Sequence, residues 1–187
     1  METPNSFLQF QKFPNCELLR KCVEDTEDKL DVNPEIKIFG KICHQRRSVG
    51  FFSNESIGYQ YSNQLSESKP MTESLVELLE IVNIIYHTNF NGILINKYLN
   101  GNDYISAHSD SESNCDVNGV VAISYGSTRK FRIRDKKTKT IVGDFPLNHA
   151  EMLIMGGDFQ KEFTHEIPIE KKIKEPRISF TFRKHEK

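Results

Sequence analysis

The sequence has no long hydrophobic run. No apolar stretch reaches the ~18 residues that a helix needs to cross a bilayer, and the N-terminus lacks the basic region and apolar stretch of a secretory signal. We therefore expect a soluble intracellular protein that makes no contact with a membrane.

Signals for disulfides or structural zinc are also missing. Cys16, Cys22, Cys43 and Cys115 are scattered along the chain, and no two of them form a C-x-x-C pair. This spacing predicts free thiols in a reducing compartment and argues against a structural zinc site.

The charge balance gives little information about partners. The chain has 25 basic and 26 acidic residues, for a net charge of −1, which alone does not favour nucleic acid over any other partner. A length of 187 residues, 37% of them hydrophobic, indicates one domain with a sizeable core. No oligomerisation signal is visible, so we expect a monomer.

Helices are expected in the first half of the chain. Residues 1–15 look irregular, 16–30 have the apolar spacing of a charged, exposed helix, and 36–43 alternate like a strand. Pro70 opens the strongest helical pattern, 71–88, whose apolar stripe suits packing against a sheet.

From residue 92 onward, short apolar or alternating runs are separated by turn signals such as Asn100-Gly101 and Gly156-Gly157. The expected strands are 92–98, 117–125, 129–135, 139–145, 151–155, 162–169 and 177–183. This pattern predicts a mainly β, α+β protein: a β-sandwich or jelly roll with helices packed on one side.

The last of these strands alternates between two kinds of side chain. Its polar set is Arg177, Ser179, Thr181 and Arg183, and its apolar set is Ile178, Phe180 and Phe182. Asn96 and Tyr98 likewise share one face of their strand. A polar face that carries arginines is unusual in a structural sheet and is expected where a strand lines a pocket.

One short motif suggests a metal site. His108 and Asp110 are two positions apart, so an extended backbone projects both to one side, and His165 is the best candidate for a third ligand. Two imidazoles and one carboxylate can bind a ferrous ion on one face and leave the other open. An isolated H-x-D also occurs by chance, and four other histidines compete for the third position: His44, His87, His149 and His185.

These motifs together resemble a known family. The series Asn96-x-Tyr98-x-x-Gly101, His108-x-Asp110-x-Glu112, His165 and Arg177-x5-Arg183 is similar to that of the AlkB-type iron(II) and 2-oxoglutarate dioxygenases. The similarity runs from about residue 45 to the C-terminus. It is closest to the eukaryotic nuclear DNA-repair branch, on the segments 130–134 and 180–184.

The resemblance implies a double-stranded β-helix, the jelly roll expected above, with N-terminal supporting helices. It implies that His108, Asp110 and His165 ligate Fe(II), with 2-oxoglutarate and O2 as cosubstrates. Residues 1–44 would form a lead-in with a helix and a first strand, and 45–187 would form the dioxygenase domain.

The resemblance also assigns the cosubstrate contacts. Arg177 would pair with the distal carboxylate of 2-oxoglutarate, helped by the Tyr98 hydroxyl, because a planar guanidinium suits a carboxylate. Arg183 and Asn96 would contact the end nearer the iron. Ser179 stands where many members have asparagine, which weakens one expected contact.

The resemblance also implies a nucleotide lid at 45–65 that contacts the substrate. Tyr59 and Tyr61 share a strand face and would stack on a base taken out of its helix, with Phe52 as a further aromatic contact. Ordinary core packing is the alternative for these aromatics. Glu112 would contact an exocyclic amine or hold a lid arginine, or would simply face solvent.

Residues 129–139 hold seven basic side chains and one acid, Asp135. Such a hairpin predicts phosphate contacts through Arg129, Arg132 and Arg134, with a solvated basic loop as the alternative.

The resulting hypothesis is an oxidative demethylase of N-alkylated bases such as 1-methyladenine and 3-methylcytosine in DNA, which releases formaldehyde. An RNA demethylase, a protein hydroxylase of the same superfamily and a binding module without catalysis are the alternatives. The nucleus is the expected compartment in a eukaryotic host and the cytoplasm otherwise.

Overall fold

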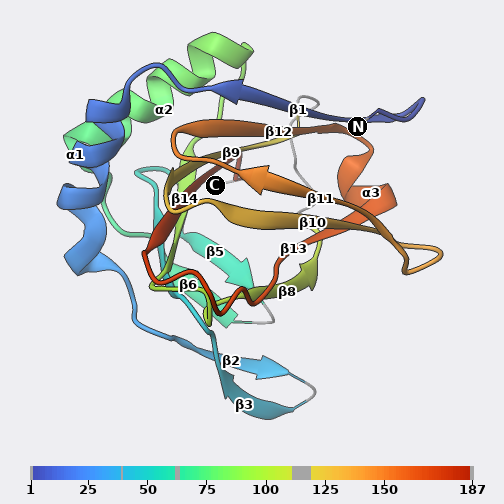
Figure 1. Cartoon of the computed structure of the whole chain (residues 1–187). Coiled ribbons are helices and arrows are strands. Elements are labelled where there is room, and N and C mark those ends of the chain that lie inside the picture. Colours follow the sequence, from blue (N-terminus) through green and yellow to red (C-terminus); the bar gives the residue numbers. More distant parts are fainter. Residues whose placement is uncertain (1, 39, 62–63, 111–118, 186–187) are drawn as a thin grey trace.

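Two antiparallel sheets that face each other form the centre of the protein. The computed structural model describes residues 2–38, 40–61, 64–110 and 119–185 (Figure 1). The large sheet has six strands, in the order β1 (Ser6–Lys12), β12 (Glu151–Gly157), β9 (Val120–Gly126), β14 (Arg177–Arg183), β7 (Gly92–Tyr98) and β4 (Ser48–Phe52). The small sheet has four, in the order β11 (Ile141–Leu147), β10 (Arg129–Asp135), β13 (Phe163–Ile167) and β8 (Ile105–His108).

Alternation along the large sheet gives the protein two large cores, beside a small cluster of Val49, Phe51 and Leu94. On β12, Met152 and Ile154 pack beneath the helices, whereas Leu153 and Met155 face the small sheet. Residues such as Phe131 of β10 complete the core between the sheets. This sandwich is the mainly β, jelly-roll architecture that the strand spacing predicts.

Two helices cover the outer face of the large sheet, α1 (Cys16–Thr26) and α2 (Glu73–Tyr86) (Figure 1). The side chain of Thr72 caps α2 by accepting a hydrogen bond from the Leu75 N–H, and His87 ends it in a left-handed conformation. Leu75 and Leu78 of α2 are buried in the core beneath it. In the part of the chain that the structure describes, no helix has the length and apolar character required to cross a membrane.

The N-terminal segment is more regular than expected. The expectation that 1–15 is irregular is wrong, because β1 pairs along its whole length with β12 at the edge of the large sheet. The helix expected over 16–30 ends at Thr26 and continues as a 3-10 turn, Glu27–Lys29. Phe13 and Leu30 lie in the same core as the strands, so this part of the N-terminal segment packs against the large sheet.

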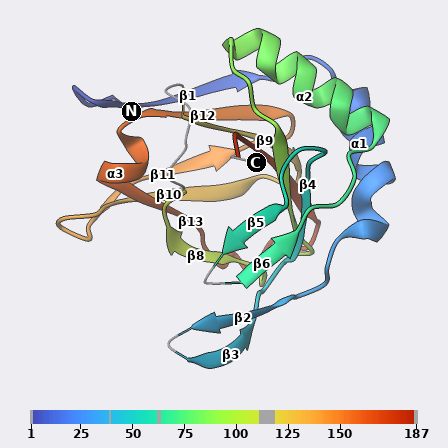
Figure 2. The same ribbon diagram turned by 180° about the vertical axis from the view of Figure 1, so that it is seen from behind.

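Two hairpins lie outside the sandwich, β2 (Glu35–Ile38) with β3 (Lys41–His44), and β5 (Gly58–Tyr61) with β6 (Gln64–Glu67) (Figure 2). The single strand expected over 36–43 is therefore wrong. Gly40 has a φ of 77°, which favours glycine and lets the chain reverse there.

Replacement of Leu78 by alanine tests the packing of α2 on the sheet. Leu78 is fully buried, at 0% exposure, whereas Ile84 on the same helix is 73% exposed. We expect Leu78→Ala to lower the free energy of unfolding by about 2–5 kcal/mol, measured by urea denaturation. Ile84→Ala is the matched control and should change it by less than about 0.5 kcal/mol. Equal losses would contradict the packing described here.

Candidate metal and cosubstrate site

The register between β8 and β13 brings the two expected histidine ligands together. His108 is the last residue of β8 and pairs directly with His165 of β13. Asp110 follows two positions later, and its carboxylate oxygens lie 3.8 Å from His108 Nε2 and 3.7 Å from His165 Nε2. One donor atom from each of the three residues lies within 4.8 Å of the others. The structure thus groups the three side chains as the sequence predicts.

The three side chains have the protonation states that a metal requires. Burial lowers the pKa of His165 to about 3 and also lowers the pKa of His108. Burial alone would raise the pKa of Asp110, but the Arg183 guanidinium and the two histidines outweigh it and hold that pKa at about 2. Neutral imidazoles and an ionised carboxylate are the forms that bind a metal ion.

A backbone contact selects which nitrogen of His108 faces the site. His108 Nδ1 lies 2.9 Å from the carbonyl oxygen of Ser106. A carbonyl oxygen can only accept, so Nδ1 carries the proton and Nε2 keeps its lone pair toward Asp110. The donor set is therefore two imidazole nitrogens and one carboxylate, which suits Fe(II) with open positions for a cosubstrate.

Arg183 contacts a proposed ligand directly. Its Nη2 donates to Asp110 Oδ1 at 2.5 Å, and both side chains are buried. Arg183 was expected to contact the cosubstrate end nearer the iron, together with Asn96. In the structure Asn96 Oδ1 instead accepts a hydrogen bond of 2.7 Å from Arg47 Nε. Both groups line the pocket, but each is also engaged with a neighbouring side chain.

Arg177 has an unused hydrogen-bond donor. Its Nε donates to Ser124 Oγ at 2.8 Å, and its guanidinium lies 5.4 Å from the centre of the Tyr98 ring. Its buried Nη1 has no hydrogen-bond partner among the described residues. Burial lowers the pKa of Arg177 to about 10, so it stays charged at neutral pH. A buried cation with a free donor fits the distal carboxylate of 2-oxoglutarate.

The pocket lies between the two sheets. Its wall on β14 is the polar set expected from alternation, and the apolar set faces the helix-covered core. Ser179 lines the pocket and pairs across the sheet with Ser124. Two supporting residues were not predicted for this pocket. Arg47 lines it, although the sequence suggested only that Arg47 adds to a phosphate-binding basic group. Ser124 accepts a hydrogen bond from Arg177 Nε, and as a polar residue inside an apolar strand it could have been noticed.

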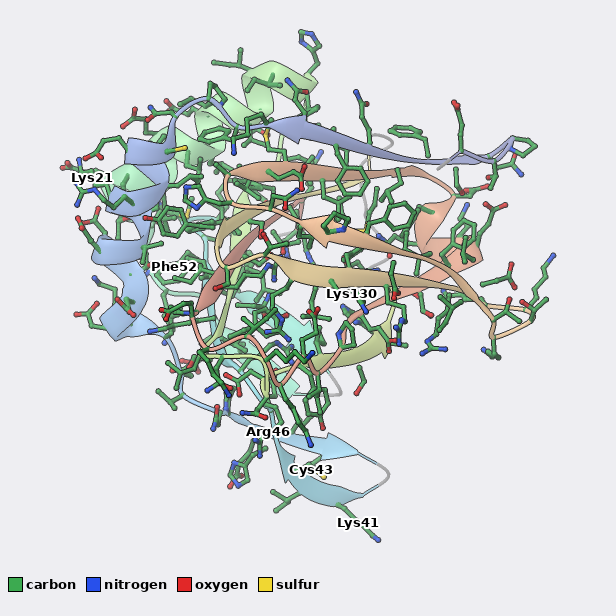
Figure 3. All side chains as sticks on the ribbon, viewed as in Figure 1. Lys21, Lys41, Cys43, Arg46, Phe52 and Lys130 are labelled. Atoms are coloured by element: carbon green, nitrogen blue, oxygen red, sulfur yellow. The ribbon has the colours of Figure 1, made fainter. Side chains whose placement is uncertain are left out.

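Two expected substrate contacts are placed elsewhere by the structure. Phe52 is fully buried in the core between the large sheet and the helices, so its ring does not face the pocket (Figure 3). Arg129 is 1% exposed and donates to Glu170 and to the carbonyl oxygens of Asn100, Asp103 and Pro168. Both predictions of a substrate contact are wrong: Phe52 packs in the core, and Arg129 holds two loops together.

The other arginines of β10 are paired with acids from neighbouring strands. Arg132 makes two hydrogen bonds to Asp144 of β11, of 2.7 and 2.9 Å, and lowers the pKa of that carboxyl to about 2. Arg134 donates to Glu166 of β13 at 2.9 Å. Lys130, on the outer side of β10 (Figure 3), lies 3.3 Å from Asp144. The strand is basic in sequence, but the sheet supplies counter-charges to it.

The remaining expected contacts are not described at the level of side chains. Tyr59 and Tyr61 lie on β5, whose backbone pairs with β6, and their side chains fall outside the described part. Glu112 also lies outside the described residues. Within the expected lid, 45–65, β4 is an edge strand of the large sheet, and β5 belongs to a hairpin with β6 that is separate from both sheets of the sandwich.

Comparison with known proteins identifies the family to which the chain is similar. A family model described as "2OG-Fe(II) oxygenase superfamily" matches residues 12–183. The human DNA oxidative demethylase ALKBH2 is 27% identical over 183 residues, which is 94% of this chain and 70% of that protein. The human alpha-ketoglutarate-dependent dioxygenase alkB homolog 3 is 35% identical over 138 residues, 67% of this chain and 47% of that protein.

A solved structure supports the architecture. The protein titled "The structure of OsALKBH1" superposes with a TM-score of 0.59 at 14% sequence identity, over 98% of this chain and 100% of that chain. At this identity the likeness concerns the fold alone. It agrees with the two-sheet sandwich described above.

The structural role of Arg129 can be tested by stability. Arg129→Ala would leave Glu170 and several carbonyl oxygens without their partner, so we expect it to lower the free energy of unfolding by about 3–5 kcal/mol. The control Arg132→Ala, on the same strand in a partly exposed pair, should cost less than about 1 kcal/mol. Urea denaturation measures both, and an Arg129 variant as stable as the Arg132 variant would contradict this assignment.

Proposed function

Because the chain belongs to the 2OG-Fe(II) oxygenase superfamily, and is thus an Fe(II)- and 2-oxoglutarate-dependent dioxygenase, we propose that it removes methyl groups from N-alkylated nucleobases. The proposed substrates are 1-methyladenine and 3-methylcytosine in DNA. The observation that carries the proposal is the grouping of two imidazoles and a carboxylate beside a buried arginine with an unused donor.

Each side chain of the pocket has a proposed task. His108, Asp110 and His165 hold the iron, and Arg177 holds the distal carboxylate of 2-oxoglutarate with Tyr98 and Ser179 beside it. Arg183 keeps the Asp110 carboxylate ionised and oriented, and Asn96, fixed by Arg47, faces the same pocket.

With iron and cosubstrate bound, the site would use one oxygen atom of O2 to convert 2-oxoglutarate to succinate and CO2 and the other to hydroxylate the N-methyl group. The hydroxymethyl product then breaks down to formaldehyde and the repaired base. The contribution of the protein is to position the reactants and to exclude water from a pocket with largely apolar walls.

Nucleic acid is the proposed partner because the relatives in the comparison include proteins named DNA oxidative demethylases. We place the nucleotide lid at the β5–β6 hairpin, where Tyr59 and Tyr61 would stack on the extruded base. Phosphate contacts are assigned to the turn between β10 and β11, where Lys137 and Lys139 are exposed. A nuclear location in a eukaryotic host stays a prediction.

Formaldehyde release from methylated oligonucleotides tests the proposed activity. Methylated DNA and RNA, single- and double-stranded, should be compared in one assay with Fe(II) and 2-oxoglutarate. We expect the wild type to act on methylated DNA and Asp110→Ala to lose activity, because two imidazoles alone provide no carboxylate ligand. A preference for RNA would move the proposal to an RNA demethylase. Turnover of no methylated nucleic acid, while 2-oxoglutarate is still consumed, would contradict it.

Replacement of Arg177 tests the cosubstrate contact separately. Loss of one partner of a buried charge pair costs about 2 kcal/mol or more, so Arg177→Ala should raise the KM for 2-oxoglutarate by about 30-fold or more. The affinity for the oligonucleotide, measured by fluorescence anisotropy, should stay within about twofold because Arg177 lies deep between the sheets. Unchanged KM in this variant would remove Arg177 from the site.

A further inference from the structure

The turn that carries the proposed ligand Asp110 is attached to the segment that carries His165. Asp110 lies beyond the end of β8 and immediately before residues outside the described part, so the strand ladder does not fix its backbone. Two hydrogen bonds do so instead. Ser109 Oγ donates to the carbonyl oxygen of Phe163 at 3.2 Å, and the Asp110 N–H donates to Gln160 Oε1 at 2.9 Å.

Gln160 is itself held in one orientation. It lies on the short helix α3 (Phe159–Glu162), directly before β13. Its Nε2 lies 3.5 Å from Met155 Sδ, a weak acceptor, which directs the amide oxygen toward Asp110. Its backbone carbonyl accepts a hydrogen bond of 2.6 Å from Lys136 Nζ. The side chain therefore offers a fixed neutral acceptor to the Asp110 backbone.

We propose that Gln160 is a positioning residue for the metal site, acting through the backbone of Asp110. Arg183 orients the Asp110 carboxylate, and Gln160 fixes the backbone from which that carboxylate extends. Both are needed, because an oriented carboxylate on a free backbone loses entropy when a metal binds. The contact also joins the segment that carries Asp110 to the segment that carries His165, because Gln160 is five residues before His165.

This inference rests on the proposed ligand set. Gln160 does not itself line the pocket, and its side chain contacts two lining residues, Asp110 and Met155. Its effect should therefore appear in metal affinity rather than only in turnover. Hydrogen-bonding partners of this kind change metal affinity by about 10–100-fold when they are removed.

The test is metal binding to the purified full chain without cosubstrate. Mn(II) affinity is measured by anaerobic isothermal titration for the wild type and three variants. Gln160→Met has similar length and no comparable acceptor, Gln160→Glu keeps an acceptor oxygen, and Lys161→Met changes the adjacent, exposed residue of the same helix. We expect Gln160→Met to bind Mn(II) about tenfold or more weakly, and the other two to stay within about threefold of the wild type.

A second measurement reports the hydrogen bond itself. Amide hydrogen exchange at Asp110 in the metal-free protein should be faster in Gln160→Met than in the wild type, and unchanged in Lys161→Met. Thermal unfolding of the metal-free proteins shows whether the fold is kept. If Gln160→Met does not fold, Gln160→Asn replaces it, because its shorter side chain withdraws the acceptor and should weaken Mn(II) binding in the same way.

The outcomes separate this inference from the ligand assignment. Mn(II) binding that survives in Asp110→Ala would overturn the ligand set. Loss of binding in Asp110→Ala, together with wild-type affinity and exchange in the Gln160 variant that lacks the acceptor, would overturn only the role of Gln160.

Discussion

The pairing of His108 with His165 across β8 and β13 is the constraint on which the proposed site depends. These residues are 57 positions apart in the chain, and only the strand register places them side by side. A slip by one residue would turn one imidazole away from the pocket, because side chains alternate between the faces of a sheet. The register is protected by the core between the sheets, where Phe131 stacks on His165 with ring centres 5.2 Å apart.

A second constraint is the pairing of the buried arginines. Four arginines are buried: Arg47, Arg129, Arg177 and Arg183. Burial of a guanidinium raises the free energy of the folded state unless hydrogen-bond partners or a ligand compensate for the lost water. Arg129 donates to loop carbonyls and Glu170, Arg183 to Asp110, and Arg47 to Asn96. Arg177 differs from Arg129 and Arg183 in having no acidic partner among the described residues: its Nε donates to Ser124 Oγ, and its Nη1 has no hydrogen-bond partner there. That difference separates the arginine that suits an anionic cosubstrate from an arginine that holds loops together.

The basic residues of β10 form a positive run in the sequence, but in the sheet they lie next to acidic residues of the neighbouring strands. The outward-facing cations lie beside Asp144 on one neighbouring strand and Glu166 on the other. Such partly exposed pairs contribute little to stability, but they reduce the local positive field. Beyond the strand, the turn between β10 and β11 carries Lys137 and Lys139, which are exposed.

The sequence by itself determined the mainly β class, the position of α2 and the two faces of the last strand. Each depends on local periodicity, which a single segment carries in full. The H-x-D motif and the spacing of the later histidine and arginines also indicated which residues belong to the site. Only the tertiary structure decided that β1 joins the large sheet, that Arg129 and Phe52 face inward, and that Gln160 contacts Asp110. These features depend on contacts between distant segments, and a residue's own neighbours in the chain do not specify which strand will lie beside it.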